Sequence, residues 1–387
     1  MPSFTAYNAI FFVFLGGACA CAAALHVYTD PFGQYEGLAP SRFGPYKAQL
    51  GSRRGKSEIP LRNACSTLVL GTSRAEMGID PESPVFETGT ACNMGLAGAN
   101  MEEILAAYRY TLKHSNVERV IFLADFLAFN TLIEAPSDFE KSRLASDRPE
   151  LEYRLDVAFR IGAAQNVLRM YYRDRKHYYT PLGHKSALSD GEMKPTRRLF
   201  RHNVLKAFGL VRYTDEGFDL YRELVRDCAA RGIDLVVAVS PVHALELEAM
   251  HVARAWDFFE QWKRELTLIT DEESKGAAPV WDFSGYTPYT TEPVPFDDKI
   301  VDGMKWHWES SHFKRALGDI VLGQLLGEDA PNTQVGERMT TATIERHLQK
   351  IRSDRAAWVN ANRAEVQWVR SVAQEVIREQ REQDAPL

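Results

Sequence analysis

The hydrophobic pattern divides the chain into an apolar N-terminal run and a longer region in which short apolar runs alternate with helical periodicity. From Ala9 to Val27 the only polar side chain is His26. About 20 apolar residues, at about 1.5 Å of rise each, are enough to span the ~30 Å hydrocarbon core of a bilayer. The alternation that begins near residue 64 indicates a parallel sheet covered by helices on both faces.

The short apolar runs predict strands, and the amphipathic stretches between them predict helices. The strands are expected at Ser66–Leu70, Ala91–Met94, Val117–Ala124, Leu235–Val239 and Val280–Phe283. The helices are expected at Met101–His114, Phe218–Ala230, Ala244–Leu268 and His312–Leu326, with Gly232 ending the second of them. We therefore expect an α/β fold with a central parallel sheet of about five strands and right-handed crossovers.

Residues 131–214 interrupt the alternation between the third and fourth strands. A helix is predicted at Leu151–Tyr172, and a stretch rich in basic and aromatic residues follows it. That stretch is a lid over the sheet edge, a binding surface for an anionic or sugar polymer, or an ordinary solvated surface. Its members are Arg173, Arg175, Lys176, His177, Tyr178, Tyr179, His184, Lys185, Arg197, Arg198, Arg201 and His202.

In the C-terminal tail, apolar residues recur at steps of three and four among charged residues. This pattern predicts one long amphipathic helix or a helical pair, which packs on its own domain, docks a partner or pairs with a second copy. The recurring positions are Ile344, Leu348, Ile351, Trp358, Val366, Val369, Ala373 and Val376. The chain thus divides into an anchor (1–28), a linker (29–63), an α/β domain (64–330) and a helical tail (331–387).

Charge and cysteine content narrow the class of protein. The net charge of −6 gives no overall attraction to nucleic acid. The five cysteines are too few and too scattered for a disulfide framework or a zinc site. We therefore expect no nucleic-acid partner, no metal and no cofactor.

The apolar run is expected to be an uncleaved membrane anchor. Residues 1–8 lack the Lys or Arg of a secretory signal peptide, although Ala18, Ala20 and Ala22 keep a cleavable signal open. Basic residues follow the run, namely Arg42, Lys47, Arg53, Arg54 and Lys56. By the positive-inside rule they favour a cytoplasmic domain, but long folded domains translocate largely regardless of such charges, so these residues leave the orientation open.

Polar residues and glycines follow the predicted strands where each strand ends. The carboxyl ends of parallel strands meet at one edge of the sheet, where open α/β proteins place their reactive groups. Here that edge is expected to carry Ser73, Gly95, Gly98, Asp125, His243 and Asp282. Taken alone, the turn that ends in Ser73 is more typical of a purely structural Gly-Thr-Ser turn than of a reactive serine.

A glutamate and a histidine late in the chain supply what a nucleophilic serine needs. A serine hydroxyl requires a base, most often histidine, and a carboxylate that orients the imidazole. Glu309 and His312 are three residues apart and lie on one side of a turn, while Asp282 is a second candidate for the acid. Candidate donors to a developing oxyanion are the backbone N–H groups of Ser73, Gly95 and Gly98 and the side chains of Asn93 and Asn100.

These blocks resemble the SGNH/GDSL hydrolase superfamily. The resemblance rests on Gly71–Arg74, the Gly95–Gly98 loop, the polar end of the third strand and the late carboxylate-x-x-His, and it covers about residues 9–35 and 64–326. With an N-terminal anchor followed by Asp30–Gly33, the chain is most similar to membrane-anchored, extracytoplasmic members. Those members are of the alginate O-acetylation and teichoic-acid D-alanylation kinds.

The resemblance implies a flavodoxin-like three-layer sandwich in which Ser73 is the nucleophile and His312 the base. It also implies Gly95 or Gly98 as the oxyanion donor of the second block. Three positions depart from the family pattern: Thr72 replaces a frequent aspartate, Asp125 or Asn130 stands near the expected asparagine, and Glu309 replaces the usual aspartate. An ionised aspartate cannot donate a hydrogen bond, so the third block is the weakest match.

The function implied by the resemblance is a serine O-acyltransferase or esterase on the periplasmic side of the cytoplasmic membrane. Its substrate is an extracellular polysaccharide or acylated glycan, and an acyl-donating membrane protein is an implied partner. The alternative is a catalytically silent relative that binds polysaccharide or scaffolds a cell-envelope assembly. A metal-dependent hydrolase built on His243, His307, His312 and Asp282 lacks the ligand spacing of a preformed site.

Overall fold

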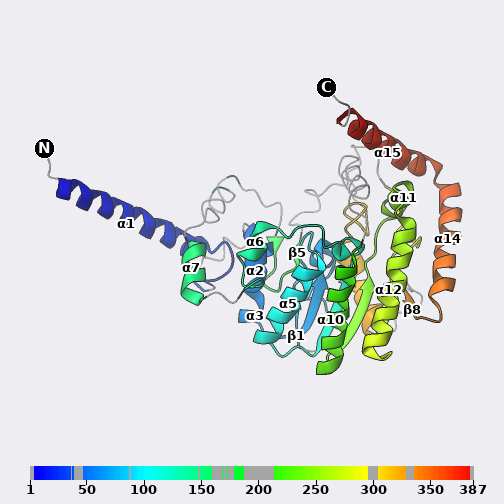
Figure 1. Cartoon of the computed structure of the whole chain (residues 1–387), viewed down its shortest axis with the longest axis horizontal. Helices are drawn as coiled ribbons and strands as arrows, with labels where there is room; N and C mark the ends of the chain where they lie inside the picture. The colour runs from blue at the N-terminus through cyan, green and yellow to red at the C-terminus, as the bar shows by residue number, and fades with distance from the viewer. Residues whose placement is uncertain are drawn as a thin grey trace.

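The centre of the molecule is a six-stranded sheet in which five strands are parallel (Figure 1). The computed structural model describes residues 4–35, 37–38, 47–86, 89–146, 149–158, 168, 172, 178–186, 213–294, 304–327 and 335–383. The parallel strands are β1 (Cys65–Gly71), β2 (Thr90–Asn93), β3 (Arg119–Ala124), β6 (Asp234–Val239) and β7 (Val280–Asp282). The predicted α/β fold with a mostly parallel sheet is confirmed.

The sixth strand, β8 (Glu337–Met339), runs antiparallel to β7 at one edge of the sheet. The sequence does not predict it, because its three residues carry no apolar run. The full strand order is β2-β1-β3-β6-β7-β8, so the winding direction reverses between β1 and β3. Open α/β sheets bind ligands outside the carboxyl ends of the strands at such a reversal. Ser73 follows β1 and Asp125 follows β3, so both stand beside that point.

Helices cover both faces of the sheet. One layer consists of α5 (Met101–His114), α10 (Asp215–Arg231) and α12 (Trp256–Ser274), and the other of α4 (Ser73–Gly78) and α13 (Arg315–Leu326). Within β1, Leu68 and Leu70 join the core on the first side, whereas Val69 joins the core on the second. Because both faces are buried, the strands consist of consecutive apolar residues.

Two predicted helix boundaries are wrong. The predicted helix 244–268 is two helices, α11 (Ala244–Val252) and α12, because Arg254 adopts a left-handed backbone with φ of 58°. Apolar residues continue through this break, so the periodicity does not reveal it. α13 begins at Arg315 and excludes His312, since His312 lies in a hairpin next to a bridge between His307 and Phe313. Gly232 ends α10 with φ of 69°, as predicted.

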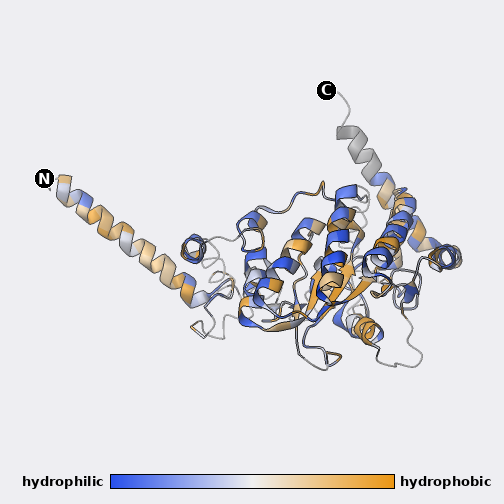
Figure 2. Ribbon diagram, turned by 60° about the horizontal axis from the view of Figure 1, so that its bottom comes forward, coloured by the Kyte–Doolittle hydropathy of each residue, from blue (hydrophilic) through white to orange (hydrophobic). Residues whose placement is uncertain are grey.

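α1 (Phe4–Thr29) is an apolar helix that projects away from the rest of the molecule (Figure 2). By length and composition it can cross a membrane. Its last turn is built into the domain, where the His26 ring stacks with Phe32. Asp30, directly after the helix, accepts a hydrogen bond from Lys47 Nζ at 2.9 Å. The C-terminal end of α1 is therefore fixed to the domain.

From Lys47 onward, the predicted linker (29–63) is part of the folded domain, which corrects the expectation from the sequence. It forms η2 (Ala48–Gly51), α2 (Arg53–Ser57) and α3 (Ile59–Arg62). Arg53 and Lys56 are buried, and Arg53 Nε lies 2.7 Å from Glu103 Oε1. A buried cation requires such partners. Here the partners come from distant segments, so the basic composition of the linker does not show that its cations are buried.

Most of the basic stretch in the 131–214 insertion lies outside the described residues. The described part contains α6 (Ser137–Glu140), α7 (Glu150–Ala158) at the start of the predicted helix, and a hairpin of β4 (Tyr178–Tyr179) and β5 (Lys185–Ser186). His184 in this hairpin donates from Nε2 to Met77 O of α4 at 3.1 Å. The insertion therefore contacts the helix that begins with Ser73.

The C-terminal tail is a helical pair, α14 (Ile344–Ala361) and α15 (Arg363–Gln383), which is one of the two predicted arrangements. Its apolar face packs on the tail's own domain, where Trp358 and Val366 share a hydrophobic core with Leu245 of α11. Self-association through the tail stays a prediction.

Cys65 and Cys92 form a disulfide between β1 and β2. The cysteine count does not predict this bond, because only the pairing of the two strands brings these distant residues together. Disulfides persist mainly in oxidising compartments. Together with α1 as a signal or anchor, the disulfide suggests that the domain lies outside the cytoplasm.

Replacing both cysteines by serine should lower the free energy of unfolding by about 3–4 kcal/mol, because the disulfide joins residues 27 positions apart in the unfolded chain. Urea unfolding of the wild type and of Cys65→Ser/Cys92→Ser measures the difference. Reduced wild type serves as the control and should behave like the variant. Identical unfolding of the oxidised wild type and the variant would contradict a stabilising disulfide.

Candidate active site

Ser73 stands on the turn that joins β1 to α4. Gly71 has φ of 147°, and a Cβ at this position would lie 2.7 Å from Leu123 O, so the turn requires glycine. Thr72 caps α4 by accepting a hydrogen bond from the Arg74 N–H. Ser73 is the first residue of the helix, where backbone N–H groups have no partner within the helix. The turn thus presents both the Ser73 hydroxyl and its N–H at the carboxyl edge of the sheet.

His312 and Glu309 meet Ser73 from the other end of the chain. Ser73 Oγ lies 2.8 Å from His312 Nε2, although the two residues are 239 positions apart. The other ring nitrogen, Nδ1, hydrogen-bonds to Glu309 Oε1. With the Nδ1 proton facing the carboxylate, Nε2 is the atom that can accept the serine proton. The predicted contact between Ser73 and His312 is confirmed.

Glu309 is 1% exposed and yet kept in its ionised form. Burial alone raises the pKa of this carboxyl, but His312, the Ser311 N–H and Arg74 outweigh burial and hold the pKa below its ordinary value. The N–H groups of Ser311 and His312 donate to the two carboxylate oxygens at 2.6 and 3.1 Å. A carboxylate fixed in this way holds the imidazole in one orientation.

His312 is carried by a β-hairpin. The Trp308 N–H donates to His312 O at 2.8 Å, and the bridged residues His307 and Phe313 are buried. Because side chains alternate along a strand, Trp308 and Lys314 lie on the same face as His312. Lys314 Nζ lies 4.5 Å from the centroid of the Trp308 ring. An aromatic ring and a cation therefore flank the histidine.

Arg74, next to the serine, connects the strand ends with this hairpin. Its Nη1 lies 3.0 Å from Asp125 Oδ1, and its Nη2 lies 3.8 Å from Glu246 Oε1. Its Nε and Nη2 donate to Ser311 Oγ at 3.3 and 3.1 Å. Arg74 is 5% exposed, so these interactions are poorly screened by water. The guanidinium thereby sets the position of the segment that ends in His312.

Asp125 acts as a partner of this cation, and its assignment to an oxyanion or substrate contact is not supported by its contacts. Its Oδ2 accepts from Thr72 Oγ1 at 2.7 Å, and its Oδ1 accepts from Arg74. Asn130, the other candidate at this strand end, uses its Oδ1 to accept from the Leu132 N–H. Thr72, which departs from the family pattern, therefore caps α4 and also binds Asp125.

Gly95 lies directly against the serine turn. A Cβ on Gly95 would lie 2.7 Å from Glu76 N and 3.0 Å from Thr72 O, so the loop after β2 contacts the residues on both sides of Ser73. The Gly95 N–H donates to Asn93 Oδ1 at 2.9 Å. Gly95 would therefore have to exchange this partner to donate to an oxyanion.

Three further candidates, Asn100, His243 and Gly98, have roles in holding the local backbone. Asn100 caps α5 through a capping box with Glu103. His243 caps α11 and donates from Nε2 to Glu292 O at 2.8 Å, while burial lowers its pKa to about 4. Gly98 is exposed and makes a bend with φ of 66°. The contacts of Asn100 and His243 leave their predicted part in substrate binding unsupported.

Asp282 is not the acid of this site, which corrects the second candidate. Its Oδ2 lies 2.6 Å from Lys263 Nζ and 2.8 Å from His347 Nε2. Burial raises the pKa of this carboxyl, but Lys263 and His347 outweigh it and hold the pKa well below its ordinary value. Asp282 thus ties α14 of the tail to β7, and Glu309 takes the place beside His312.

Sequence reasoning missed Arg74, Ser311 and Glu246. The sequence does place Arg74 and Ser311 next to the candidate residues, because Arg74 directly follows Ser73 and Ser311 directly precedes His312. Glu246 gave no signal, because a glutamate on a helix normally faces solvent. In the structure it is buried and accepts from Ser310 Oγ at 2.9 Å.

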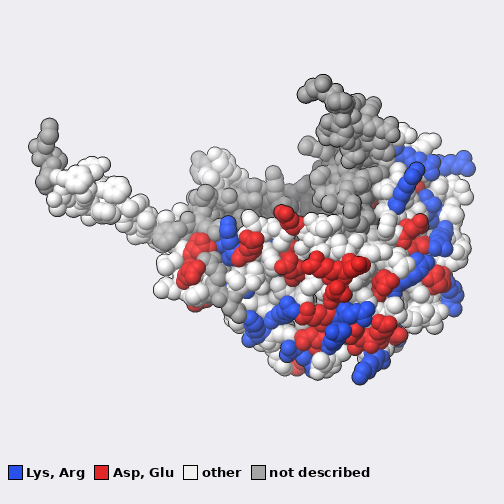
Figure 3. All heavy atoms as spheres, viewed as in Figure 1, with Lys and Arg blue, Asp and Glu red and all other residues white. Residues whose placement is uncertain are grey.

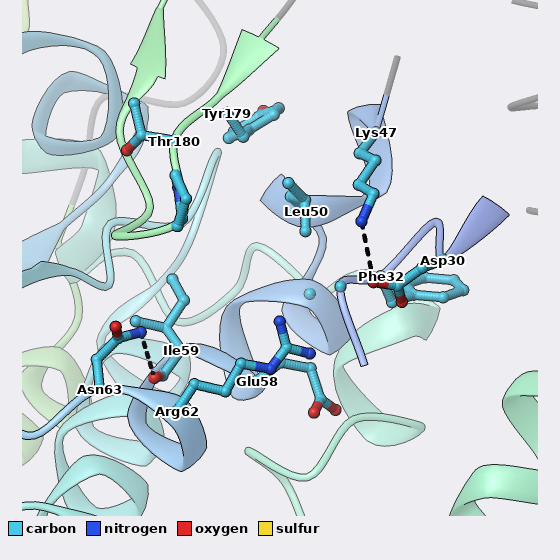
Figure 4. A pocket seen from close by; sticks show the side chains of 13 residues that line it. Asp30, Phe32, Lys47, Leu50, Glu58, Ile59, Arg62, Asn63, Tyr179 and Thr180 are labelled. Atoms are coloured by element: carbon cyan, nitrogen blue, oxygen red, sulfur yellow. Dashed lines mark hydrogen bonds and ion pairs between the residues drawn. The ribbon is translucent and has the colours of Figure 1, made fainter. Parts of the chain in front are cut away.

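Other features of the described residues lie apart from this site. No group of three His, Cys, Asp or Glu side chains in the described part of the chain could hold a metal ion. A cavity of about 150 Å³ lies at the base of α1, where Lys47 pairs with Asp30 and Arg62 lies beside Glu58 (Figure 4). The surface in Figure 3 carries acidic and basic side chains side by side. One of the exposed ion pairs of the described residues joins Arg109 of α5 to Glu223 of α10.

Comparisons with known proteins assign the chain to no family. No known protein family matches the chain, and no curated protein or solved structure shows significant similarity to it. A functional conclusion therefore rests on the contacts of Ser73, His312 and Glu309.

Glu246 should make the stability of the protein depend on pH. Burial raises its pKa to about 7, with Arg74 opposing and Glu309 adding to the shift. Between pH 4.5 and 7 the unfolded state loses this proton while the folded state keeps it, so stability falls as pH rises. The loss amounts to roughly 3 kcal/mol at about 1.4 kcal/mol per pKa unit.

Urea unfolding of the wild type and of Glu246→Gln, at pH 4.5 and pH 7.5, measures this contribution. Glutamine keeps an acceptor for Ser310, and every other titrating group is common to both proteins. The wild type should therefore lose more stability than the variant over this interval. Parallel pH profiles would show that Glu246 titrates normally.

Proposed function

We propose that the protein is a membrane-anchored serine O-acyltransferase or esterase that acts on an extracellular polysaccharide. The observation that carries the proposal is the continuous contact from Ser73 Oγ through the His312 ring to the Glu309 carboxylate. A serine at a strand end, within hydrogen-bond reach of an oriented imidazole, is the arrangement that acyl transfer requires.

The chemistry proceeds in two halves. Ser73 Oγ attacks the carbonyl carbon of an ester, and its proton passes to His312 Nε2 while negative charge forms on the carbonyl oxygen. The bond to the leaving alcohol then breaks, and His312 returns the proton to that alcohol. Water or a sugar hydroxyl next attacks the carbonyl carbon of the acyl group on Ser73 and gives up its proton to His312. The bond between that carbon and Ser73 Oγ then breaks, His312 returns the proton to Oγ, and the free acid or the acylated sugar leaves.

The Ser73 N–H is the first candidate to stabilise the oxyanion, because it is the first N–H of α4 and belongs to the nucleophile itself, which is only half-buried. The Gly95 loop is the second, since Gly95 packs against Thr72 O, just before Ser73, and against Glu76 N, in the first turn of α4. Glu309 stabilises the imidazolium that forms when His312 holds the proton.

The finer fold assignment and the location form part of the same proposal. The five parallel strands, with their reversal between β1 and β3, have the order of a flavodoxin-like sheet, which supports an SGNH-like sandwich. α1 as a single-pass anchor and the disulfide support a periplasmic domain on the cytoplasmic membrane. The polysaccharide substrate and an acyl-donating membrane partner rest on the family resemblance.

A catalytically silent polysaccharide-binding or scaffold protein is the second candidate. It is favoured by the oxyanion side of the site, where the Gly95 N–H already has a partner and Asp125 is occupied by Thr72 and Arg74. The two candidates differ in whether Ser73 reacts.

Hydrolysis of an activated acetyl ester by the full-length protein in detergent separates them. Ser73→Ala and His312→Asn should each lower kcat/KM by about 10³-fold or more, because the parts of a triad act as one unit. Glu309→Gln should lower it by about 10²–10⁴-fold through loss of the imidazole orientation. Ser83→Ala is the matched control, since this buried serine contacts Asp319 and none of the triad. Undiminished hydrolysis by Ser73→Ala contradicts the triad, and an inactive wild type favours the silent protein.

A further inference from the structure

We propose that Lys56, from the segment between the anchor and the sheet, is a positioning residue for Ser73. This inference rests on the proposed function, because it assigns Lys56 a part in holding the nucleophile in place. Lys56 does not contact Ser73. It acts through Asn93 at the end of β2.

Lys56 is fully buried and joins three distant segments. Its Nζ donates to Asn93 O at 3.0 Å and to Gly183 O of the β4–β5 hairpin at 2.6 Å. It also lies 3.8 Å from Glu76 Oε1 on α4. A buried ammonium with these partners fixes α2, the end of β2 and the hairpin relative to one another.

Asn93 passes this constraint to the helix that begins with Ser73. Its Nδ2 donates to Ala75 O at 2.8 Å and to Ile79 O at 2.7 Å, and its Oδ1 accepts from the Gly95 N–H. Ala75 lies in the first turn of α4, Ile79 directly follows the helix, and Gly95 lies in the loop beside it. A shift of Asn93 therefore moves α4 and the Gly95 loop together.

Glu76 indicates that this arrangement has a cost in stability. Its carboxylate is 0% exposed, and neither oxygen has a hydrogen-bond partner among the described residues. Burial raises the pKa of Glu76, with Lys56 opposing, and burial lowers the pKa of Lys56 to about 8. A buried ion pair of this kind is weak evidence for stability, so a role in fixing one conformation is the more direct explanation.

A second contact from the same segment supports this role. Arg53, one helical turn before Lys56, donates from Nη2 to Ala97 O at 2.9 Å and pairs with Glu103 at the start of α5. The segment thus holds both ends of the loop from Asn93 to Asn100. Because Gly95 in this loop would clash with Thr72 O and Glu76 N if it carried a Cβ, the loop has little room to move without displacing Ser73.

The test separates positioning from folding with a double variant. Lys56→Met alone leaves Glu76 buried without its cation and should unfold readily. Lys56→Met/Glu76→Gln removes both charges and should recover most of the lost melting temperature. Its kcat for the activated ester should nevertheless stay about 10–100-fold below that of the wild type, with KM changed by less than about threefold, because a displaced nucleophile slows the chemical step.

Arg355→Met/Glu248→Gln is the matched control, since it removes an ion pair with a fully buried carboxylate that holds α14 on α11. This control should keep wild-type kcat at temperatures where it is folded. A Lys56→Met/Glu76→Gln protein with wild-type kcat would overturn the inference while leaving the proposed function intact. A wild type that neither hydrolyses the ester nor reacts with a fluorophosphonate would overturn both.

Discussion

The candidate site depends on the interactions of the buried Arg74 guanidinium. Arg74 follows the serine in the chain, pairs with Asp125 across the reversal of the sheet and holds Ser311 beside His312. Without it, Asp125 and Glu246 would be buried beside Glu309 with no cation between them, and breaking a buried ion pair in this way costs about 3–5 kcal/mol. The same charge that balances these carboxylates also brings together two segments from opposite ends of the domain.

Segments outside the central sheet converge on the helix that starts with Ser73. Lys56 reaches it from the segment between α1 and the sheet through Asn93, and His184 reaches it from the insertion through Met77 O. The tail is tied to the far side of the sheet through Asp282. The apolar helix α1 is joined to the first of these segments through the contact of Asp30 with Lys47, so the N-terminal helix and Ser73 belong to one connected structure.

The sequence predicts most of the sheet and the three residues that meet at the candidate site, because strand ends and the chemistry of serine, histidine and glutamate are local signals. It does not predict their surroundings. Whether Asp282 or Glu309 faces His312 depends on Lys263 and His347, which neutralise Asp282 from other elements. The Cys65–Cys92 bond and the burial of Lys56 likewise follow from strand and helix pairing, which residue spacing does not contain.

We propose that His312 activates Ser73 as the nucleophile. Mass-spectrometric peptide mapping of the full-length protein after reaction with a fluorophosphonate tests it most directly, because the reagent forms a stable bond only with an activated hydroxyl. We expect a single adduct on Ser73 that disappears in His312→Asn. An adduct on another serine, or on Ser73 at the same rate in His312→Asn, would contradict it.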